Sequence, residues 1–262
     1  MRFEFRTGAW LGGILTLMIL SGCGGGDAFT DCDGAGLCVA RVEVSRYSGT
    51  LPLSPRSGFW TSAQGPRPVT VELGPQLITN PQWPNPSIKS VTISAARSES
   101  EIAIRLKWRD ATRDLGQGGT HPYPDQAALL FPLDRSQDLP PITMGAEGEM
   151  VNIWIWKASR DPALTLPPGG APASAAPGQA VEDLNAEGFS TLTRQAHQDV
   201  LGRGVRTEDG WEVVYKRALD NDDALDARFS GSTPMAVAIW DGGNRETNGQ
   251  KGISGWIFLK FI

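Results

Sequence analysis

The sequence has few of the residues on which most metal and nucleic-acid sites depend. Only two histidines occur among 262 residues, His121 and His197, so a multi-histidine metal centre cannot be built. The 24 lysines and arginines are outnumbered by 29 aspartates and glutamates, and no basic run follows the first few residues. A net charge near -5 gives no field that attracts phosphate backbones. Nucleic acid is therefore excluded as an expected partner.

Common catalytic motifs are also missing. No Gly-x-Ser-x-Gly, Walker loop, His-Glu-x-x-His or Gly-x-Gly-x-x-Gly stands in a convincing context. Asp110, Asp125, Glu182 and Asp241 could pair for hydrolysis, but no spacing selects a pair among them. We therefore expect these carboxylates at surface or turn positions, and we do not expect the chain to be catalytic by itself.

Long apolar runs are absent except for a short one near the N-terminus. The stretch from Ala9 to Leu20 follows a basic start and is too short to span a bilayer comfortably, which is typical of an export signal. Residues 20–23 (LSGC) resemble the lipobox of bacterial lipoproteins. The resemblance implies that residues 1–22 are removed and that Cys23 carries lipid, so that the folded part is anchored to a membrane on its extracytoplasmic, periplasmic side. A plain secretory signal with an incidental cysteine is the alternative.

Cysteine is scarce too, with only Cys23, Cys32 and Cys38 present. In an oxidising compartment, a disulfide that closes the loop CDGAGLC between Cys32 and Cys38 is the simplest interpretation. A metal pair is the alternative, although no histidine lies nearby, and the spacing is not the Cys-x-x-Cys-His of c-type haem. Residues 23–38 are therefore expected to form a lipid tether with a small disulfide loop.

What the sequence does contain is alternation of apolar and other side chains. Within residues 102–108 the apolar side chains at even positions alternate with Ala, Arg and Lys, which is typical of a strand. Further stretches of strand character, bounded by Gly, Pro, Asn or Asp, are residues 69–73, 91–93, 151–156, 211–215, 235–240 and 256–261. No long segment has helical spacing. The pattern predicts an all-β fold, an antiparallel β-sandwich with irregular loops and short helices, as one domain over residues 39–262.

Two regions break this pattern. Residues 161–179 (DPALTLPPGGAPASAAPGQ) are rich in Pro, Gly and Ala and cannot form a core strand, so we predict a loop that is either functional or disordered. Residues 181–203 are expected to add a short helix or an irregular cap.

A series of sequence blocks occurs in an order that resembles one known family. The blocks are WRD (108–110), YPDQAA (123–128) leading into FP (131–132), ITMG (142–145), VNIWIWKA (151–158), WEVVYKRAL (211–219), AVAIWDG (236–242) and NGQKGISGW (248–256). They resemble the haem b-binding gamma subunits of periplasmic molybdenum enzymes of the dimethyl sulfoxide reductase family, such as ethylbenzene dehydrogenase, selenate reductase, chlorate reductase and dimethyl sulfide dehydrogenase. The similarity covers roughly residues 40–262.

The resemblance implies one non-covalent haem b whose iron has a methionine and a lysine as axial ligands. The family methionine stands in the Met-Gly turn before the Val-Asn-Ile-Trp strand, which here is Met144. The family lysine stands in the Asn-Gly-x-Lys segment, which here is Lys251. Lys157 and Lys260 also lie near the blocks, and a shift in the alignment would move the lysine assignment. Neither histidine is expected to be a ligand.

The chemistry of these two side chains suits that role. A thioether is a soft neutral ligand that favours Fe(II). A lysine binds iron only as the neutral amine, so an apolar pocket that lowers its pKa from about 10.4 would assist. Trp154, Trp156, Trp240 and Trp256 are expected in the core or the pocket wall.

The resemblance further implies an electron-transfer subunit without its own catalytic site. It would relay electrons between the iron–sulfur beta subunit of a complex, whose alpha subunit holds molybdenum, and a soluble cytochrome or other electron carrier. Two alternatives remain open at this point. One is a surface lipoprotein whose β-sandwich binds carbohydrate without haem, with several accessible tryptophans on one face. The other is a related sandwich that has lost haem and only supports assembly.

Overall fold

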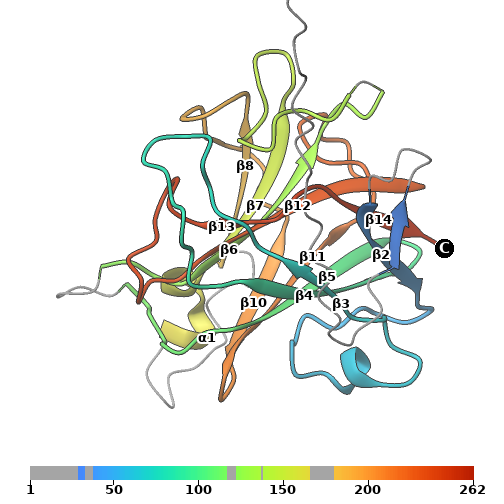
Figure 1. The fold of residues 1–262 in the computed structure, drawn as a ribbon. Coiled ribbons are helices and arrows are strands. Elements are labelled where there is room, and N and C mark those ends of the chain that lie inside the picture. The colour runs from blue at the N-terminus through green and yellow to red at the C-terminus, as the bar shows by residue number, and fades with distance from the viewer. Residues whose placement is uncertain (1–28, 33–37, 117–121, 137, 166–179) are drawn as a thin grey trace, which may run out of the picture.

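A computed structural model of the chain describes residues 29–32, 38–116, 122–136, 138–165 and 180–262 (Figure 1). Almost all regular structure in these ranges is strand. The strands are β1 (Phe29–Cys32), β2 (Cys38–Arg46), β3 (Val69–Glu72), β4 (Ser90–Arg97), β5 (Glu101–Arg109), β6 (Gln126–Pro132), β7 (Val151–Lys157), β8 (Val181–Ala186), β9 (Thr193–Arg194), β10 (Leu201–Arg206), β11 (Gly210–Ala218), β12 (Ser232–Trp240), β13 (Gly252–Ile253) and β14 (Ile257–Phe261). The helices are short: η1 (Gly58–Thr61), η2 (Ala158–Arg160) and α1 (Pro162–Thr165). The all-β prediction is confirmed.

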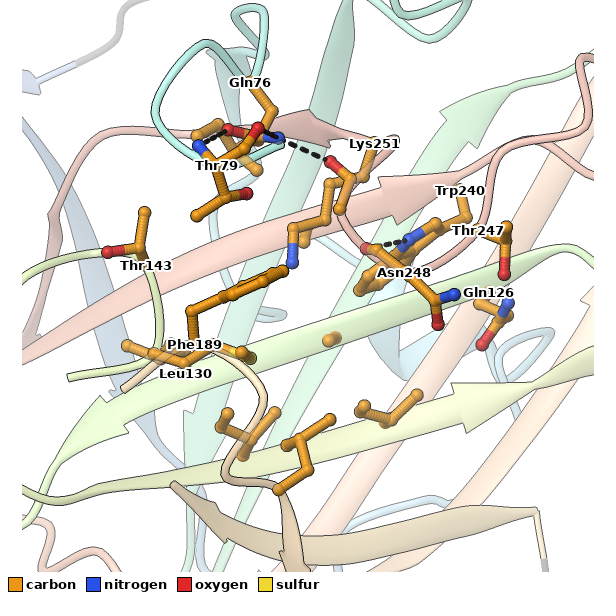
Figure 2. A pocket seen from close by; sticks show the side chains of 18 of the residues that line it. Gln76, Thr79, Gln126, Leu130, Thr143, Phe189, Trp240, Thr247, Asn248 and Lys251 are labelled. Carbon is orange, nitrogen blue, oxygen red and sulfur yellow. Dashed lines mark hydrogen bonds between the residues drawn. The ribbon is translucent and has the colours of Figure 1, made fainter. Parts of the chain in front are cut away.

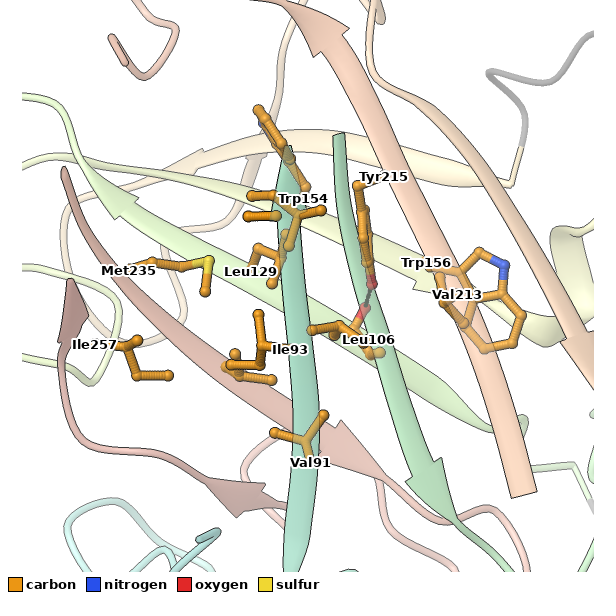
Figure 3. Close-up of a cluster of buried hydrophobic side chains, with 14 of the residues drawn as sticks. Val91, Ile93, Leu106, Leu129, Trp154, Trp156, Val213, Tyr215, Met235 and Ile257 are labelled. Atoms are coloured by element: carbon orange, nitrogen blue, oxygen red, sulfur yellow. Dashed lines mark hydrogen bonds between the residues drawn. The ribbon is translucent and has the colours of Figure 1, made fainter. Parts of the chain in front are cut away.

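The strands form one sheet that curls so that its two halves pack face to face. Its order is β10-β11-β5-β4-β2-β14-β12-β6-β7-β8-β9, with β1 beside β2, β3 beside β4 and β13 beside β12. The long strand β12 forms the corner, because its first residues pair with β14 while Ala236–Trp240 pair with β6. The main core lies between the halves and joins Leu106 and Val213 to Leu129 and Trp154 (Figure 3).

One polar contact ties the two halves together through this core. The hydroxyl of Tyr215 in β11 donates a hydrogen bond of 2.8 Å to the carbonyl of Ala127 in β6. The tyrosine is fully buried, so the bond satisfies a hydroxyl that would otherwise be costly to remove from water. This bond therefore fixes the position of β11 in one half of the sheet relative to β6 in the other half.

Two strand pairings depart from the predicted antiparallel arrangement. β14 pairs with β2 in parallel, and β2 pairs with β4 in parallel. In β2, Val42 and Val44 face the core and are fully buried. The alternation of buried and other residues along β2 determines which side of the strand faces the core. It is the same for a parallel and an antiparallel neighbour, so the sequence could not indicate the parallel pairing.

The prediction of a helix or irregular cap over residues 181–203 is also wrong. This segment contains β8, which pairs with β7, the short β9 and the start of β10. Asp183 and Asn185 of β8 are buried in polar contacts: Asp183 accepts a hydrogen bond from Asn152 at 2.6 Å, and Asn185 donates to the carbonyl of Leu225 at 2.8 Å. Polar side chains inside a buried strand hide the apolar pattern by which strands are predicted.

The N-terminal predictions fall mostly outside the described residues. Cys32 and Cys38 are opposite each other in the antiparallel pairing of β1 with β2. Their side chains are outside the described part, so the disulfide stays a prediction. Residues 1–22, with the expected export signal, and the proposed lipid site Cys23 are likewise outside it. Within the described residues, no helix is both long and apolar enough to cross a membrane.

Candidate functional site

A cavity of about 630 Å³ lies over the outer face of the sheet formed by β12, β6 and β7 (Figure 2). Its floor is built from alternate residues of these strands: Ala128, Leu130, Ile153, Ile155, Ala236 and Ala238. Its walls come from the segments around residues 76–81, 142–144, 189–192 and 247–251. The site is therefore an apolar sheet surface enclosed by loops that are distant in sequence.

The alternation of β7 explains how one strand serves both the core and the cavity. Ile153 and Ile155 face the cavity, whereas Trp154 and Trp156 point the other way and are fully buried in the main core. Trp240, at the end of β12, lines the cavity wall. The prediction that these tryptophans belong to the core or the pocket wall is confirmed.

Lys251 reaches into the cavity from the segment between β12 and β13 (Figure 2). Its Nζ lies 4.8 Å from the centroid of the Trp240 ring. Burial lowers the pKa of the Lys251 amine to about 8. Within the described residues, no carboxylate or hydrogen-bond acceptor pairs with this Nζ. The neutral amine, which is the form that can bind a metal, is therefore much more accessible than in a lysine surrounded by water.

Gln76 fixes the segment that carries Lys251. Its side-chain amide donates to the carbonyls of Gly249 at 3.0 Å, Thr79 at 3.0 Å and Pro81 at 3.2 Å. Only 1% of Gln76 is exposed. This one buried amide therefore joins two walls of the cavity, and no periodic pattern in the sequence could have indicated its role.

Two further contacts hold the same segment. The indole N–H of Trp240 donates to the carbonyl of Asn248 at 3.0 Å. Ile253 exchanges two backbone hydrogen bonds with Gly74, of 2.7 and 3.1 Å. Lys251 is thus held between two anchored ends, which limits the positions that its side chain can reach.

Met144 lines the cavity from a tight turn. Both Met144 and Gly145 have left-handed backbones, with φ of 77° and 76°. Gly145 donates to the carbonyl of Pro141 at 2.9 Å, and Gly188 donates to the carbonyl of Met144 at 2.7 Å. A methionine at positive φ is strained, so these contacts must hold the turn. A Cβ on Gly145 would lie 2.3 Å from the carbonyl oxygen of Glu149, which accounts for the glycine.

The three candidate lysines have different surroundings. Lys251 and Lys157 both line the cavity, whereas Lys260 is exposed on β14. The Nζ of Lys157 lies 2.6 Å from Glu182, which is also paired with Arg160. Burial alone would raise the pKa of Glu182, but these two cations outweigh it and lower that pKa. Lys157 is therefore committed to an ion pair, and Lys251 is not.

Among the described residues, no histidine lines this cavity. His197 is exposed, with 76% of its side chain accessible, and it lies 3.1 Å from Asp223. It is not among the residues that line the cavity. His121 lies outside the described residues.

Three of the four carboxylates lie outside the strands, next to strand ends, as expected for turn positions, but they are buried and not at the surface, whereas Glu182 lies in β8. Asp110, Asp125 and Asp241 are buried together beneath the ends of β5, β6 and β12. Burial, followed by the charge of Asp110, raises the pKa of Asp125 to about 8, and burial also raises the pKa of Asp110. The three residues are widely separated in sequence, so only the folded chain reveals the cluster.

Comparisons with known proteins agree with the sequence blocks. The family model described as "Ethylbenzene dehydrogenase" matches residues 57–166. Chlorate reductase subunit gamma of Ideonella dechloratans is 28% identical over 223 residues, which cover 84% of each chain. A protein of Haloferax mediterranei named as a respiratory nitrate reductase heme subunit is 28% identical over 212 residues, or 80% of this chain and 68% of that one. Dimethylsulfide dehydrogenase subunit gamma of Rhodovulum sulfidophilum is 30% identical over 181 residues, or 66% and 60% of the two chains.

These relatives confirm the resemblance to the haem-binding gamma subunits of dimethyl sulfoxide reductase-family enzymes. They are named as subunits of enzymes, which agrees with the prediction that this chain is a non-catalytic subunit. Among solved structures, a family 9 carbohydrate-binding module of Caldicellulosiruptor kristjanssonii in complex with cellotriose aligns with 85% of this chain and 94% of its own. Its TM-score of 0.42 and identity of 9% are too low to indicate a function.

Proposed function

We propose that the chain binds one haem b in the cavity and passes single electrons within a multi-subunit enzyme complex. The observation that carries this proposal is Lys251, whose amine has no counter-charge among the described residues and faces the same apolar cavity as Met144. The volume of about 630 Å³ is within the range of roughly 300–1,000 Å³ typical of cofactor sites. The donor set also fits haem iron, since methionine is an axial ligand in cytochromes and a neutral amine offers a nitrogen lone pair, as imidazole does.

The chain's own residues would set the properties of the bound group. Haem supplies one-electron chemistry between Fe(III) and Fe(II). Met144 and the neutral form of Lys251 would hold the iron without adding negative charge, which would favour the reduced state and raise the potential. The floor of Ala, Ile and Leu side chains excludes water from one side. The ion pair of Lys157 with Glu182 keeps that lysine from competing for the iron.

We further propose the place of the chain in an electron path. It relays electrons between the iron–sulfur beta subunit of a complex, whose alpha subunit holds molybdenum, and a soluble cytochrome or other electron carrier. The names of the relatives as subunits of reductases and dehydrogenases support a complex of several chains. The direction of flow follows from the catalytic chain: this subunit accepts electrons if that chain oxidises its substrate, and donates them if it reduces one.

Titration with haemin tests the proposal against carbohydrate binding. We expect the tryptophan fluorescence of the haem-free protein to be quenched, because Trp240 lines the cavity, and to saturate at one haem per chain. A His197→Ala control should behave like the wild type. A fluorescence response to cellotriose with none to haemin would favour the carbohydrate-binding alternative. Support for that alternative is weak, because every tryptophan in the described ranges is buried or half-buried.

We also propose that Cys23 carries lipid and anchors the mature chain on the extracytoplasmic side of a membrane. The support is the sequence LSGC at residues 20–23 after a short apolar run. Cys23→Ala is expected to move the protein from the membrane fraction to the soluble fraction and to abolish labelling with palmitate. Membrane association that persists in this variant would contradict the proposal.

A further inference from the structure

Three aspartates meet where the ends of strands from both halves of the curled sheet come together. Asp110 directly follows β5, Asp125 directly precedes β6, and Asp241 directly follows β12. One carboxylate oxygen from each lies within 4.8 Å of the others. The residues are 4%, 0% and 9% exposed, respectively. This is an enclosed group of like charges, which is costly unless something compensates it.

Asp125 is held in place by three N–H groups. Its Oδ2 accepts from the backbone of Asp114 at 2.8 Å and from the indole of Trp211 at 3.0 Å, and its Oδ1 accepts from the backbone of Gly242 at 2.9 Å. These bonds use both lone-pair sites of Oδ2 and one of the two on Oδ1, so Oδ1 keeps a free site. The carboxylate is therefore positioned rigidly and can still bind a cation.

Asp110 has an oxygen with no partner. Its Oδ1 accepts from the backbone N–H of Thr112 at 2.9 Å, but its Oδ2 is buried and has no hydrogen bond among the described residues. Oδ2 of Asp114 is buried and unpartnered in the same way. Buried polar atoms in native proteins normally have a partner, so two such oxygens indicate a missing one.

Oδ1 of Asp241 and the unpartnered Oδ2 of Asp114 both lie close to Gly243. A Cβ placed on Gly243 would lie 3.1 Å from Oδ2 of Asp114 and 3.1 Å from Oδ1 of Asp241. The same Cβ would lie only 2.4 Å from Oγ1 of Thr112, so the glycine allows three side-chain oxygens to approach this point. Arg206 is close by, but its guanidinium donates at 2.9 Å to the backbone carbonyl of Asp110.

A second acidic cluster in the protein serves as a comparison. Asp183, Asp199 and Asp226 also gather their oxygens within 4.8 Å. That cluster contains a buried counter-charge, because Nη1 of Arg217 lies 3.2 Å from Oδ1 of Asp226. In the described residues, no salt bridge joins an Arg or Lys side chain to the carboxylates of Asp110, Asp125 or Asp241. Burial raises the pKa of Asp110 and outweighs the charge of Arg206, which lowers that pKa. The first cluster is therefore less well compensated than the second, which contains a salt bridge.

We propose that Asp110, Asp125 and Asp241, with Asp114 as an additional ligand, bind one Ca²⁺ ion. The donors are all oxygen atoms, which suit a hard cation and not zinc or copper. Ca²⁺ accepts six to eight oxygen ligands in flexible geometry, whereas Mg²⁺ usually keeps several waters and is bound through one or two carboxylates. A group of three or four buried carboxylates from the protein therefore suits Ca²⁺ better.

The ion would hold both halves of the sheet where they approach the cavity. It would join the end of β5 to the start of β6 and the end of β12. Asp241 also begins the segment that leads to Lys251, and its backbone N–H donates to the buried carboxylate of Glu246 at 3.0 Å. Ca²⁺ binding does not require haem, so the proposal is independent of the function proposed above.

Calorimetry and thermal unfolding of the full haem-free chain, treated with EGTA, test the site. We expect saturable binding of one Ca²⁺ per chain and a Tm higher by about 5 °C at about 1 mM CaCl₂, with a smaller effect of MgCl₂. Asp110→Asn should weaken binding at least about tenfold. The matched control Asp183→Asn, in the cluster that contains Arg217, should bind like the wild type.

Two results would overturn the proposal. The first is a folded wild-type protein with no Ca²⁺ binding and an unchanged Tm, in which case the aspartates share protons instead. The second is Ca²⁺ binding that is equally strong in the wild type and in Asp110→Asn, which would mean that the ion binds elsewhere.

Discussion

Lys251→Leu is expected to stabilise the haem-free protein at about pH 7, by about 1–3 kcal/mol in the free energy of unfolding. Burial lowers the pKa of Lys251 from 10.5 to about 8, so the folded chain holds the ammonium group in an unfavourable place. The difference between these pKa values corresponds to at most about 3 kcal/mol, and water in the open cavity reduces it. Leucine has a similar apolar volume and no charge to bury.

The burial of Lys251 also predicts the direction in which the free energy of unfolding changes with pH. Because the pKa is lower in the folded chain, the unfolded chain binds more protons between about pH 8 and 10.5. The free-energy cost of burying the protonated Lys251 amine is fully present below about pH 8 and disappears above about pH 10.5. The free energy of unfolding of the wild type therefore rises between these two pH values. Urea unfolding at about pH 7 and pH 10 should show the advantage of Lys251→Leu shrinking.

A matched control separates this effect from general changes in charge. Lys260 is exposed on β14, so Lys260→Leu should change the free energy of unfolding by no more than about 0.5 kcal/mol at either pH. Destabilisation of the haem-free protein by Lys251→Leu at about pH 7 would show that the amine has a structural partner. If Lys251→Leu stabilises the haem-free protein and also abolishes haem binding, Lys251 is a residue that binds haem and lowers the stability of the fold.

Arg217→Met is expected to lower the free energy of unfolding by about 3–5 kcal/mol. Arg217 is buried in the core, with its Nη1 3.2 Å from Asp226, and its guanidinium lies over the rings of Trp154 at 5.1 Å and Phe229 at 5.2 Å. Burial raises the pKa of the nearby Asp183 to about 8 even with the arginine present. Without Arg217, the buried carboxylates lose their only charged partner in the described part of this cluster.

Two further variants test the reason for this loss. The exposed pair of Arg109 with Asp209, 3.6 Å apart, should contribute little, so Arg109→Met should change stability by less than about 0.5 kcal/mol. Arg217→Met combined with Asp226→Asn should recover part of the loss, because it removes one unpaired charge. A loss below about 1 kcal/mol for Arg217→Met in urea unfolding would contradict the account.

The strands that alternate clearly could be predicted from the sequence alone. The predicted stretch 69–73 corresponds to β3, and 151–156 corresponds to β7, each within one residue of the observed bounds. β8 was missed because Asp183 and Asn185 are buried through hydrogen bonds, and burial of this kind leaves no apolar pattern. The direction of β2 was missed because strand pairing depends on the whole fold.

Some residues of the candidate site could be predicted from the sequence and others could not. Met144 and Lys251 were found only through the order of the sequence blocks, since a lone methionine or lysine in a turn has no distinguishing spacing. Gln76 was not predicted, because its role depends on carbonyls from a segment that the fold brings next to it. The cluster of Asp110, Asp125 and Asp241 was missed for the same reason, since each residue is an ordinary turn aspartate until the strand ends meet.

The measurement that tests the central claim most directly is the absorption spectrum of the purified protein, oxidised and dithionite-reduced, after expression with adequate haem. We predict a sharp low-spin spectrum of b type in the reduced wild type. The spectrum should become high-spin or be lost in Met144→Leu and in Lys251→Leu, while Lys157→Met should retain it. A wild-type protein without a Soret band, or a low-spin spectrum unchanged in both ligand variants, would contradict the account.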